Sequence, residues 1–193
     1  MILNRRSLLT VFSAALAGLT AGKAATAAAP DPQNVLYLDT KDGRITILLR
    51  PDLAPQHVER IKALAKRGFY NGVVFHRVIE GFMAQTGDPT GTGRGGSELP
   101  NLPAEFTSTP FKRGTLGMAR SSDPNSANSQ FFICLADSAF LDGKYTVFGE
   151  VISGMDVVDK IKRGSKDDQG AVTAPDKIVK MQIAADVPAG KPK

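Results

Sequence analysis

The sequence predicts a mainly β domain in which two helices accompany many short strands. Short stretches that alternate between apolar and polar residues recur along the chain, as they do in half-buried strands. Turn-forming residues such as Lys41-Asp42-Gly43 and Asn71-Gly72 separate these stretches. Apolar residues recur at helical spacing in two places only. This pattern is typical of an open sandwich or a barrel, and composition alone does not choose between the two.

The expected strands are short and lie on both sides of a long irregular region. Residues 86–113 are rich in Gly, Pro, Ser and Thr, so they are expected to form loops. The segments predicted to be strands are Val35–Thr40, Arg44–Leu49, Val73–Val78, Gly114–Ala119, Gln130–Leu135, Tyr145–Val151 and Lys177–Ile183.

The first predicted helix begins at Pro55, because proline suits the first turn of a helix. Apolar residues follow at helical spacing, and Gly68 is suited to end the helix. His57 falls on this helix and is expected to be solvated. The second helix is predicted over Met155–Ile161.

Residues 1–27 are predicted to be a secretory signal peptide. Arg5 and Arg6 form a positive start, residues 8–19 are apolar and uncharged, and Ala25-Thr26-Ala27 matches a cleavage site. The apolar run is shorter than the roughly 20 residues that span a bilayer. An uncleaved membrane anchor is the alternative. Residues 4–9 also resemble a degenerate twin-arginine signal, so that export route and general secretion both stay open. We expect a periplasmic protein.

The rest of the chain is expected to be one domain. Residues 28–34 are predicted to be a short linker, residues 35–185 the domain, and residues 186–193 a flexible tail. The net charge falls from +5 to +2 once Arg5, Arg6 and Lys23 leave with the signal. A nucleic-acid-binding protein would present a basic stripe, and this sequence has none.

One motif invites a nucleotide-binding interpretation that the neighbouring residues exclude. Residues 91–96 match G-x-G-x-x-G, which binds dinucleotides when a strand precedes it and a helix follows. Here Ser97-Glu98-Leu99-Pro100 follows, with Pro103 just beyond, so no helix begins there.

Other catalytic classes also lack candidate residues. There is no G-x-S-x-G elbow for a hydrolase and no cluster with metal-ligand spacing. The single cysteine, Cys134, lies in an apolar run and is expected to be a core residue. No cofactor is expected.

One arginine stands out because apolar residues surround it. Arg77 lies between Phe75 and Val78 in the segment 74–85, and a second apolar stretch follows at residues 129–135. Together these stretches could form an apolar pocket with one cation in its wall. Such a pocket suits an uncharged substrate whose reaction needs one strong hydrogen-bond donor and no nucleophile.

Four motifs resemble one protein family. FHRVIEGFMAQTGD, GTGRGG, SQFFI and LDGKYTVFGEV occur in the order and at the spacings of the cyclophilin-type peptidyl-prolyl cis-trans isomerases. The resemblance runs from about Val35 to about Ile183. It implies a closed eight-stranded antiparallel barrel capped by two α-helices.

The resemblance also implies which residues act. Arg77 matches the catalytic arginine of the family. The residues that match its proline pocket are Phe82, Met83, Phe132 and Leu141.

Further matches concern the backbone of a bound peptide. Gln85 and Gln130 match side chains that hydrogen-bond to it, and Ala119 and Arg120 match the segment along which it lies extended.

The sequence departs from the family's common pattern at the edge of this site. Phe140 stands where a tryptophan is common, and Tyr145 stands where a histidine is common. The stretch 121–128 is one residue longer than the commonest eukaryotic form. These differences bear on drug binding and on the rim of the pocket, where Phe140 and Tyr145 are expected to contact substrate.

We therefore expect a monomeric isomerase of Xaa-Pro peptide bonds that acts on proline-containing polypeptides, including unfolded or exported proteins. Neither nucleic acid nor stable membrane insertion after cleavage is expected. The alternative is a proline-peptide binding module or chaperone on the same fold, with incidental catalysis. Arg77 favours the enzyme, since a module that only binds has no need of this cation.

Overall fold

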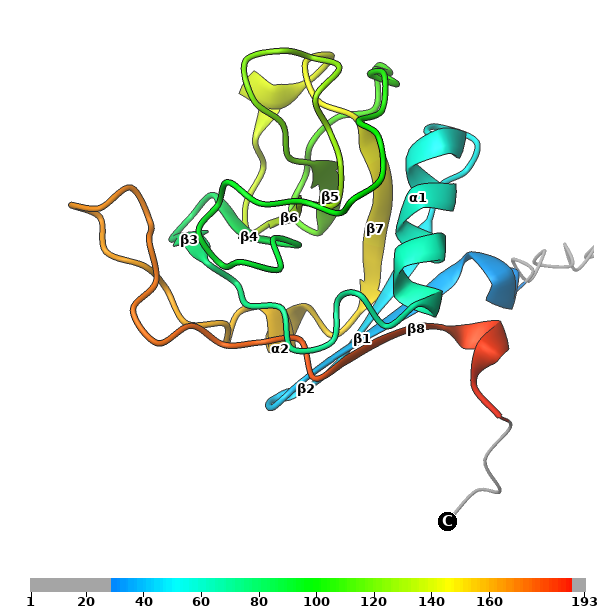
Figure 1. Ribbon diagram of the computed structural model, residues 1–193, viewed down its shortest axis with the longest axis horizontal. Helices are drawn as coiled ribbons and strands as arrows, with labels where there is room; N and C mark the ends of the chain where they lie inside the picture. The colour runs from blue at the N-terminus through cyan, green and yellow to red at the C-terminus, as the bar shows by residue number, and fades with distance from the viewer. Residues whose placement is uncertain (1–28, 189–193) are drawn as a thin grey trace, which may run out of the picture.

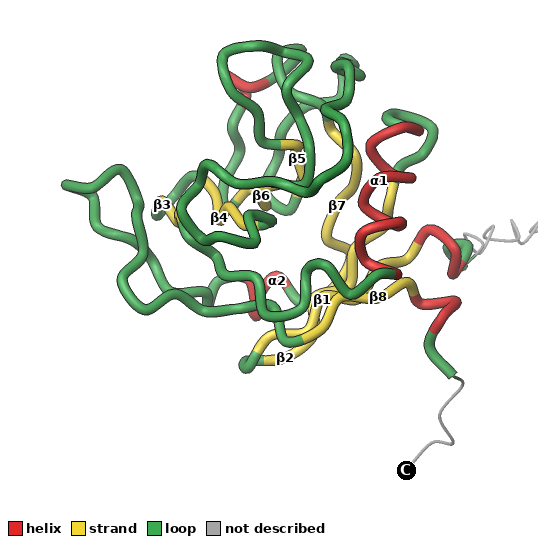
Figure 2. The backbone as a smooth tube through the Cα atoms, viewed as in Figure 1, coloured by secondary structure: helices red, strands yellow, loops and turns green. Residues whose placement is uncertain are grey.

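The computed structural model describes residues 29–188, which form one curled β-sheet and two α-helices (Figures 1 and 2). The predicted signal peptide, residues 1–27, and residues 189–193 of the predicted tail lie outside the described residues. The strands are β1 Val35–Thr40, β2 Gly43–Leu49, β3 Arg77–Ile79, β4 Met83–Thr86, β5 Thr115–Met118, β6 Phe131–Cys134, β7 Val147–Ser153 and β8 Lys180–Ile183. The helices are α1 Pro55–Lys66 and α2 Met155–Val158, with single 3-10 turns η1 Pro32–Asn34, η2 Ala139–Leu141 and η3 Ala184–Asp186.

All the strand pairs are antiparallel, and the sheet runs in the order β3-β4-β6-β5-β7-β2-β1-β8. The expected eight strands and two helices are therefore confirmed. The two end strands meet through the segments that precede them: Phe75 N–H donates to Asp176 O at 2.8 Å, and Ile178 N–H donates to Val73 O at 2.9 Å. The sheet curls far enough for irregular backbone, rather than a regular strand ladder, to join its two ends.

The region predicted as one strand, Val73–Val78, is different in the structure. Only its end belongs to β3, and residue 74 makes an isolated bridge to Lys177. β4 follows after a turn at Gly81, whose φ of 71° favours glycine. The sequence prediction missed β4, because the apolar residues of 78–84 conceal this turn.

The two helices contact different strands, and both pack into the cluster inside the curled sheet. α1 begins at Pro55, as predicted, and contacts β7 and β8, whereas α2 contacts β2 (Figure 1). The prediction for α2 was too long, because the helix ends at Val158. Beyond that residue, hydrogen bonds such as Ile161 N–H to Val158 O connect residues three apart, which makes a tighter turn.

The prediction that His57 is solvated was wrong, because Glu105 gives the imidazole a partner inside the protein. His57 is fully buried, and its Nδ1 lies 2.6 Å from the Glu105 carboxylate. Glu105 also accepts the backbone N–H groups of Gln56 and His57 at 3.2 and 3.1 Å, so it caps the first turn of α1. Burial lowers the pKa of His57, so the ring is neutral at pH 7 and donates from Nδ1.

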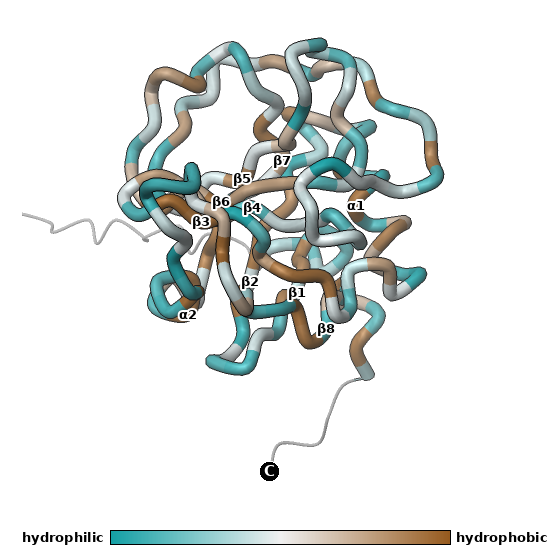
Figure 3. The backbone as a smooth tube through the Cα atoms, turned by 60° about the vertical axis from the view of Figure 1, so that its left-hand side comes forward, coloured by the Kyte–Doolittle hydropathy of each residue, from teal (hydrophilic) through white to brown (hydrophobic). Residues whose placement is uncertain are grey.

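The apolar core has two parts, one on each side of β6. Phe131 and Ile133 point into the large cluster that fills the curled sheet, whereas Phe132 and Cys134 point into a smaller cluster outside it. Both faces of β6 are buried, and this explains its unbroken apolar sequence. In Figure 3, apolar stretches lie along β1, β3 and β8, while many loop tips are polar.

We predict that Glu105→Ala lowers the free energy of unfolding by roughly 2–3 kcal/mol, since it leaves buried donors of α1 and His57 without an acceptor. Urea unfolding at pH 7 measures this loss. Glu59→Ala is the control on the same helix; its side chain is 72% exposed, so a change within about 0.5 kcal/mol is expected. Equal losses in the two variants would show that the Glu105 contacts do not stabilise the fold.

Candidate active site

The strand register places the predicted catalytic arginine in one row with other predicted site residues. Arg77 on β3 lies opposite Gln85 on β4, and Gln85 lies opposite Phe132 on β6. Met83 lies opposite Cys134 in the next row of the same face. Because side chains alternate between the faces of a strand, Met83 and Gln85 both point to the outer side of the sheet.

A glycine gives the aromatic rings room on this face. Gly117 on β5 lies opposite Phe132. A Cβ atom at Gly117 would be 2.4 Å from the Phe132 ring and 2.6 Å from the Phe111 ring, so any larger residue would displace both rings. Phe111 and Phe132 stack with 5.8 Å between ring centroids.

These residues surround a pocket of about 430 Å³. The pocket brings together every predicted site residue except Gln130. Its lining residues are Arg77, Phe82, Met83, Gln85, Ala119, Arg120, Phe132, Phe140, Leu141 and Tyr145.

The pocket has an apolar floor and an aromatic rim. Met83, Phe132 and Leu141 are almost completely buried and form the floor. At the rim, the rings of Phe82 and Phe140 lie 5.1 Å apart, and Phe140 is 60% exposed. The two rings together form an apolar edge beside the pocket that a ligand can contact.

Hydrogen bonds hold the Arg77 guanidinium from two sides. Its Nη1 donates to Gln85 Oε1 at 3.3 Å, and its Nε donates to the Gln169 backbone oxygen at 3.0 Å. Gln85 in turn donates from Nε2 to Gln130 Oε1 at 2.8 Å.

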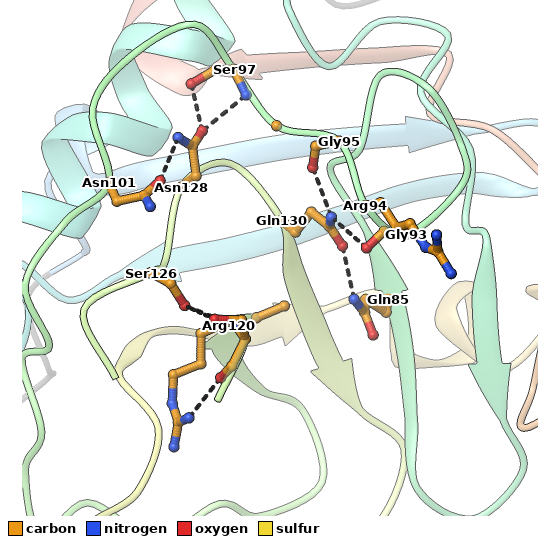
Figure 4. A pocket seen from close by; sticks show the side chains of 13 residues that line it. Gln85, Gly93, Arg94, Gly95, Ser97, Asn101, Arg120, Ser126, Asn128 and Gln130 are labelled. Carbon is orange, nitrogen blue, oxygen red and sulfur yellow. Dashed lines mark hydrogen bonds between the residues drawn. The ribbon is translucent and has the colours of Figure 1, made fainter. Parts of the chain in front are cut away.

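Gln130 therefore lies behind the wall of this pocket, and it instead lines a neighbouring, more polar pocket. It donates from Nε2 to the backbone oxygens of Gly93 and Gly95, at 3.1 and 2.8 Å (Figure 4). These bonds fix which end of its amide faces Gln85, and so which end of the Gln85 amide faces Arg77.

The glycine-rich loop, residues 91–96, binds a carboxylate of the protein itself instead of a phosphate. Asp88 is fully buried and accepts the N–H groups of Thr90, Gly93 and Gly95 at 2.8, 2.7 and 3.1 Å. Burial alone would raise the pKa of Asp88, but these hydrogen bonds outweigh it and hold the pKa at about 2. The carboxylate thus occupies the donors that a nucleotide would need.

A second, more polar pocket of about 600 Å³ adjoins the first and shares Gln85, Ala119 and Arg120 with it. Asn128 organises its wall, since it accepts from Ser97 N–H at 2.9 Å (Figure 4). It also donates to Leu99 O at 2.8 Å. The sequence prediction included Gln85, Ala119, Arg120 and Gln130 of this pocket but missed Ser97 and Asn128. The Gly, Ser and Asn of two separate loops meet here, and no spacing along the chain signals that meeting.

Arg120 is held at the boundary of the two pockets. Its guanidinium lies over the Tyr145 ring, 4.4 Å from the centroid, and donates to the backbone oxygens of Ser121 and Lys144 at 2.9 and 2.8 Å. A stacked and hydrogen-bonded arginine keeps its backbone in place for main-chain contacts with a ligand.

Neither the thiol of Cys134 nor the imidazole of His76 lines the pocket. Burial raises the pKa of the Cys134 thiol to about 12, and Cys134 is part of the core, as predicted. His76 lies beneath Gly93 rather than in the pocket wall, and burial lowers its pKa. Within residues 29–188, no group of three His, Cys, Asp or Glu side chains could hold a metal ion.

A family profile and individual related proteins identify the same family for this sequence. The sequence profile of the family described as cyclophilin type peptidyl-prolyl cis-trans isomerase/CLD matches residues 35–183. A probable peptidyl-prolyl cis-trans isomerase of Brucella suis is 57% identical over 90% of this chain and 94% of its own length. Peptidyl-prolyl cis-trans isomerase-like 1 of Aspergillus fumigatus is 47% identical over 68% of this chain and 86% of its own.

Solved structures show the same fold. A cyclophilin from Hirschia baltica superposes with a TM-score of 0.75 at 28% identity, covering 83% of this chain and 77% of its own. A cyclophilin-type isomerase from Cryptosporidium parvum, solved in the presence of the dipeptide Ala-Pro, gives a TM-score of 0.72 at 30% identity, over 77% and 98% of the two chains. With its fold, its pocket and its sequence relatives in agreement, this chain belongs to the cyclophilin-type peptidyl-prolyl cis-trans isomerases.

Proposed function

We propose that Arg77 is the catalytic residue of this isomerase and acts by hydrogen-bonding the prolyl nitrogen of a bound Xaa-Pro peptide. Resonance gives the peptide C–N bond its double-bond character and a rotation barrier of roughly 18–20 kcal/mol. In the twisted transition state this resonance is lost, and the nitrogen acquires a lone pair. A donor aimed at that lone pair binds the twisted form more tightly than the planar one.

One observation carries the proposal: a guanidinium with a free donor stands in the wall of an apolar pocket. Nε and Nη1 of Arg77 are occupied by protein oxygens, whereas Nη2 has no hydrogen-bond partner among residues 29–188. The pocket floor of Met83, Phe132 and Leu141 suits a proline ring. The apolar surroundings also strengthen a hydrogen bond made there by excluding water. Neither a nucleophile nor a general base is needed.

The polar groups beside the apolar pocket suit the backbone of a bound peptide and so support the proposal. Gln85, Ala119 and Arg120 form the edge between the two adjoining pockets, and Gln130 lines the more polar one. We propose that an extended peptide crosses this edge with its proline in the apolar pocket.

We further propose that the clients are proteins exported to the periplasm. Residues 1–27 support this proposal through their positive start, apolar stretch and A-x-A site. No helix formed by residues 29–188 combines the length and the apolar character needed to cross a bilayer.

Replacement of the proposed catalytic group gives the most direct test. We predict that Arg77→Ala lowers kcat/KM for a short Xaa-Pro peptide by roughly 10²–10³, or about 2.7–4 kcal/mol, with the fold intact. Arg77→Lys should recover little, because a flexible ammonium cannot be held by two acceptors as the planar fork is. Arg44→Ala is the matched control, since Arg44 pairs with Asp39 outside the pocket. An Arg77→Ala variant within threefold of wild type would exclude the mechanism, and would favour a proline-peptide binder or chaperone.

Turnover should vary little with pH between about 6 and 8. Burial lowers the pKa of both His57 and His76 below the ordinary value, so both are neutral over most of this range, and protonation begins only at its acid end. Above about pH 6.5 the neutral rings contribute in full to the free energy of unfolding, and this contribution is lost as the pH falls below that value. A pH–rate profile measures this, and a tenfold change between pH 6 and 8 would indicate a general acid or base.

Phe140 should weaken inhibition by cyclosporin. In cyclophilins that bind this drug tightly, the tryptophan common at this position donates an indole N–H, and phenylalanine has no such donor. The lost hydrogen bond corresponds to about 1–3 kcal/mol, or roughly 5- to 150-fold weaker binding. We predict that Phe140→Trp increases inhibition with little change in turnover. Equal inhibition constants for the two forms would show that residue 140 does not control drug binding.

The export proposal is tested by the mass of the mature protein. We expect cleavage after Ala27 or within two residues of it, and recovery of the product from the periplasmic fraction. Intact mass spectrometry that finds Met1 to Ala27 still attached would support the membrane-anchored alternative.

A further inference from the structure

A segment remote in sequence from the pocket lies along the free edge of β3. Residues 164–172, here called the 164–172 segment, belong to the loop that extends beyond β3 in Figure 1. Val78 N–H donates to Gly170 O at 2.8 Å, Gly164 N–H donates to Val78 O at 2.9 Å, and Val172 N–H donates to His76 O at 3.1 Å. The backbone on both sides of Arg77 is thus bound to this segment.

Two glycines make the contact close. A Cβ atom at Gly170 would lie 2.4 Å from Ile79 Cγ1, and one at Gly164 would lie 1.9 Å from the Gly170 oxygen. No side chain fits at either position, so the segment can be packed directly against the β3 backbone. Its position relative to Arg77 is correspondingly well defined.

Gln169 is the residue of this segment that reaches the guanidinium, and it does so with its backbone. Its carbonyl oxygen accepts the Nε–H of Arg77 at 3.0 Å, while its side chain is exposed and makes no hydrogen bond within residues 29–188. Its φ of 49° is unusual for a residue other than glycine. Backbone strain of this kind often persists at functional sites, where the surrounding structure maintains it.

We propose that Gln169 is a positioning residue, whose left-handed backbone conformation aims a carbonyl at Arg77 and thereby orients the guanidinium for catalysis. The proposal rests on the catalytic role assigned to Arg77 above. Gln85 holds Nη1 and Gln169 holds Nε, so the two acceptors together fix the plane of the guanidinium. They leave Nη2 to face the substrate. With only one acceptor, the long side chain could rotate about the remaining hydrogen bond.

The identity of the side chain at residue 169 is then unimportant, whereas its φ angle is decisive. Gln169→Pro locks φ near −65° and turns the carbonyl away from Arg77. It removes no backbone N–H bond found among residues 29–188, because Gln169 N–H makes none. Gln169→Gly is the matched variant, since glycine adopts positive φ readily.

Two measurements on the full-length mature protein test the proposal. The first is kcat and KM for an Xaa-Pro peptide, and the second is the hydrogen-exchange protection of the Arg77 Nε–H by ¹⁵N NMR. For Gln169→Pro we expect kcat to fall about tenfold or more with KM within twofold, since misplacement by about 1 Å can cost up to 100-fold. Protection of the Nε–H should be lost. Gln169→Gly should restore both kcat and protection.

Wild-type kcat and a protected Nε–H in Gln169→Pro would overturn the proposal, as would equal losses of kcat in the proline and glycine variants. If the proline variant does not fold, Gln169→Val takes its place, because a β-branched residue also disfavours positive φ. The NMR measurement is independent of activity. If Arg77→Ala proves active, the catalytic role fails, while the Nε–H signal still shows whether Gln169 holds the guanidinium.

Discussion

The hydrogen bonds that orient the Arg77 guanidinium are the constraint on which the site depends. A flexible arginine beside an apolar pocket would spend most of its time in water, because its side chain has many rotamers and its charge is better solvated there. Here the carbonyl of Gln85 faces the arginine, and Gln130 fixes the orientation of that amide. Gln130 is in turn fixed by two carbonyls of the glycine-rich loop.

The orientation of Gln130 depends in turn on the buried carboxylate of Asp88, which binds the glycine-rich loop. Its hydrogen bonds with Gly93 and Gly95 N–H hold the loop in the conformation that presents their carbonyls to Gln130. A G-x-G-x-x-G sequence thus serves here to organise two amide side chains. The chemistry remains that of one cation whose Nη2 donors have no partner among residues 29–188, and the groups behind the guanidinium determine where those donors point.

Much of the fold and site could be predicted, because the alternation of apolar and polar residues indicates strands and the order of the motifs indicates the family. β1 has the predicted bounds, and the pocket brings together the expected residues apart from Gln130. Two of the failures involve contacts between segments distant in sequence. His57 is buried because Glu105 reaches it, and Gln169 meets Arg77 through its backbone, which carries no sequence signal. β4 was missed for a local reason: the turn that divides its hairpin is short, is centred on Gly81 and lies among apolar residues.

A crystal structure of the protein with a bound Xaa-Pro peptide would test the central claim most directly. The proline ring should lie on Met83, Phe132 and Leu141, with the peptide backbone extended past Gln85 towards the polar pocket. Nη2 of Arg77 should lie within about 3.5 Å of the prolyl nitrogen, near the limit for a hydrogen bond, while its bonds to Gln85 and Gln169 persist. A guanidinium turned away from the nitrogen, or a proline ring outside the pocket, would contradict the proposed role of Arg77.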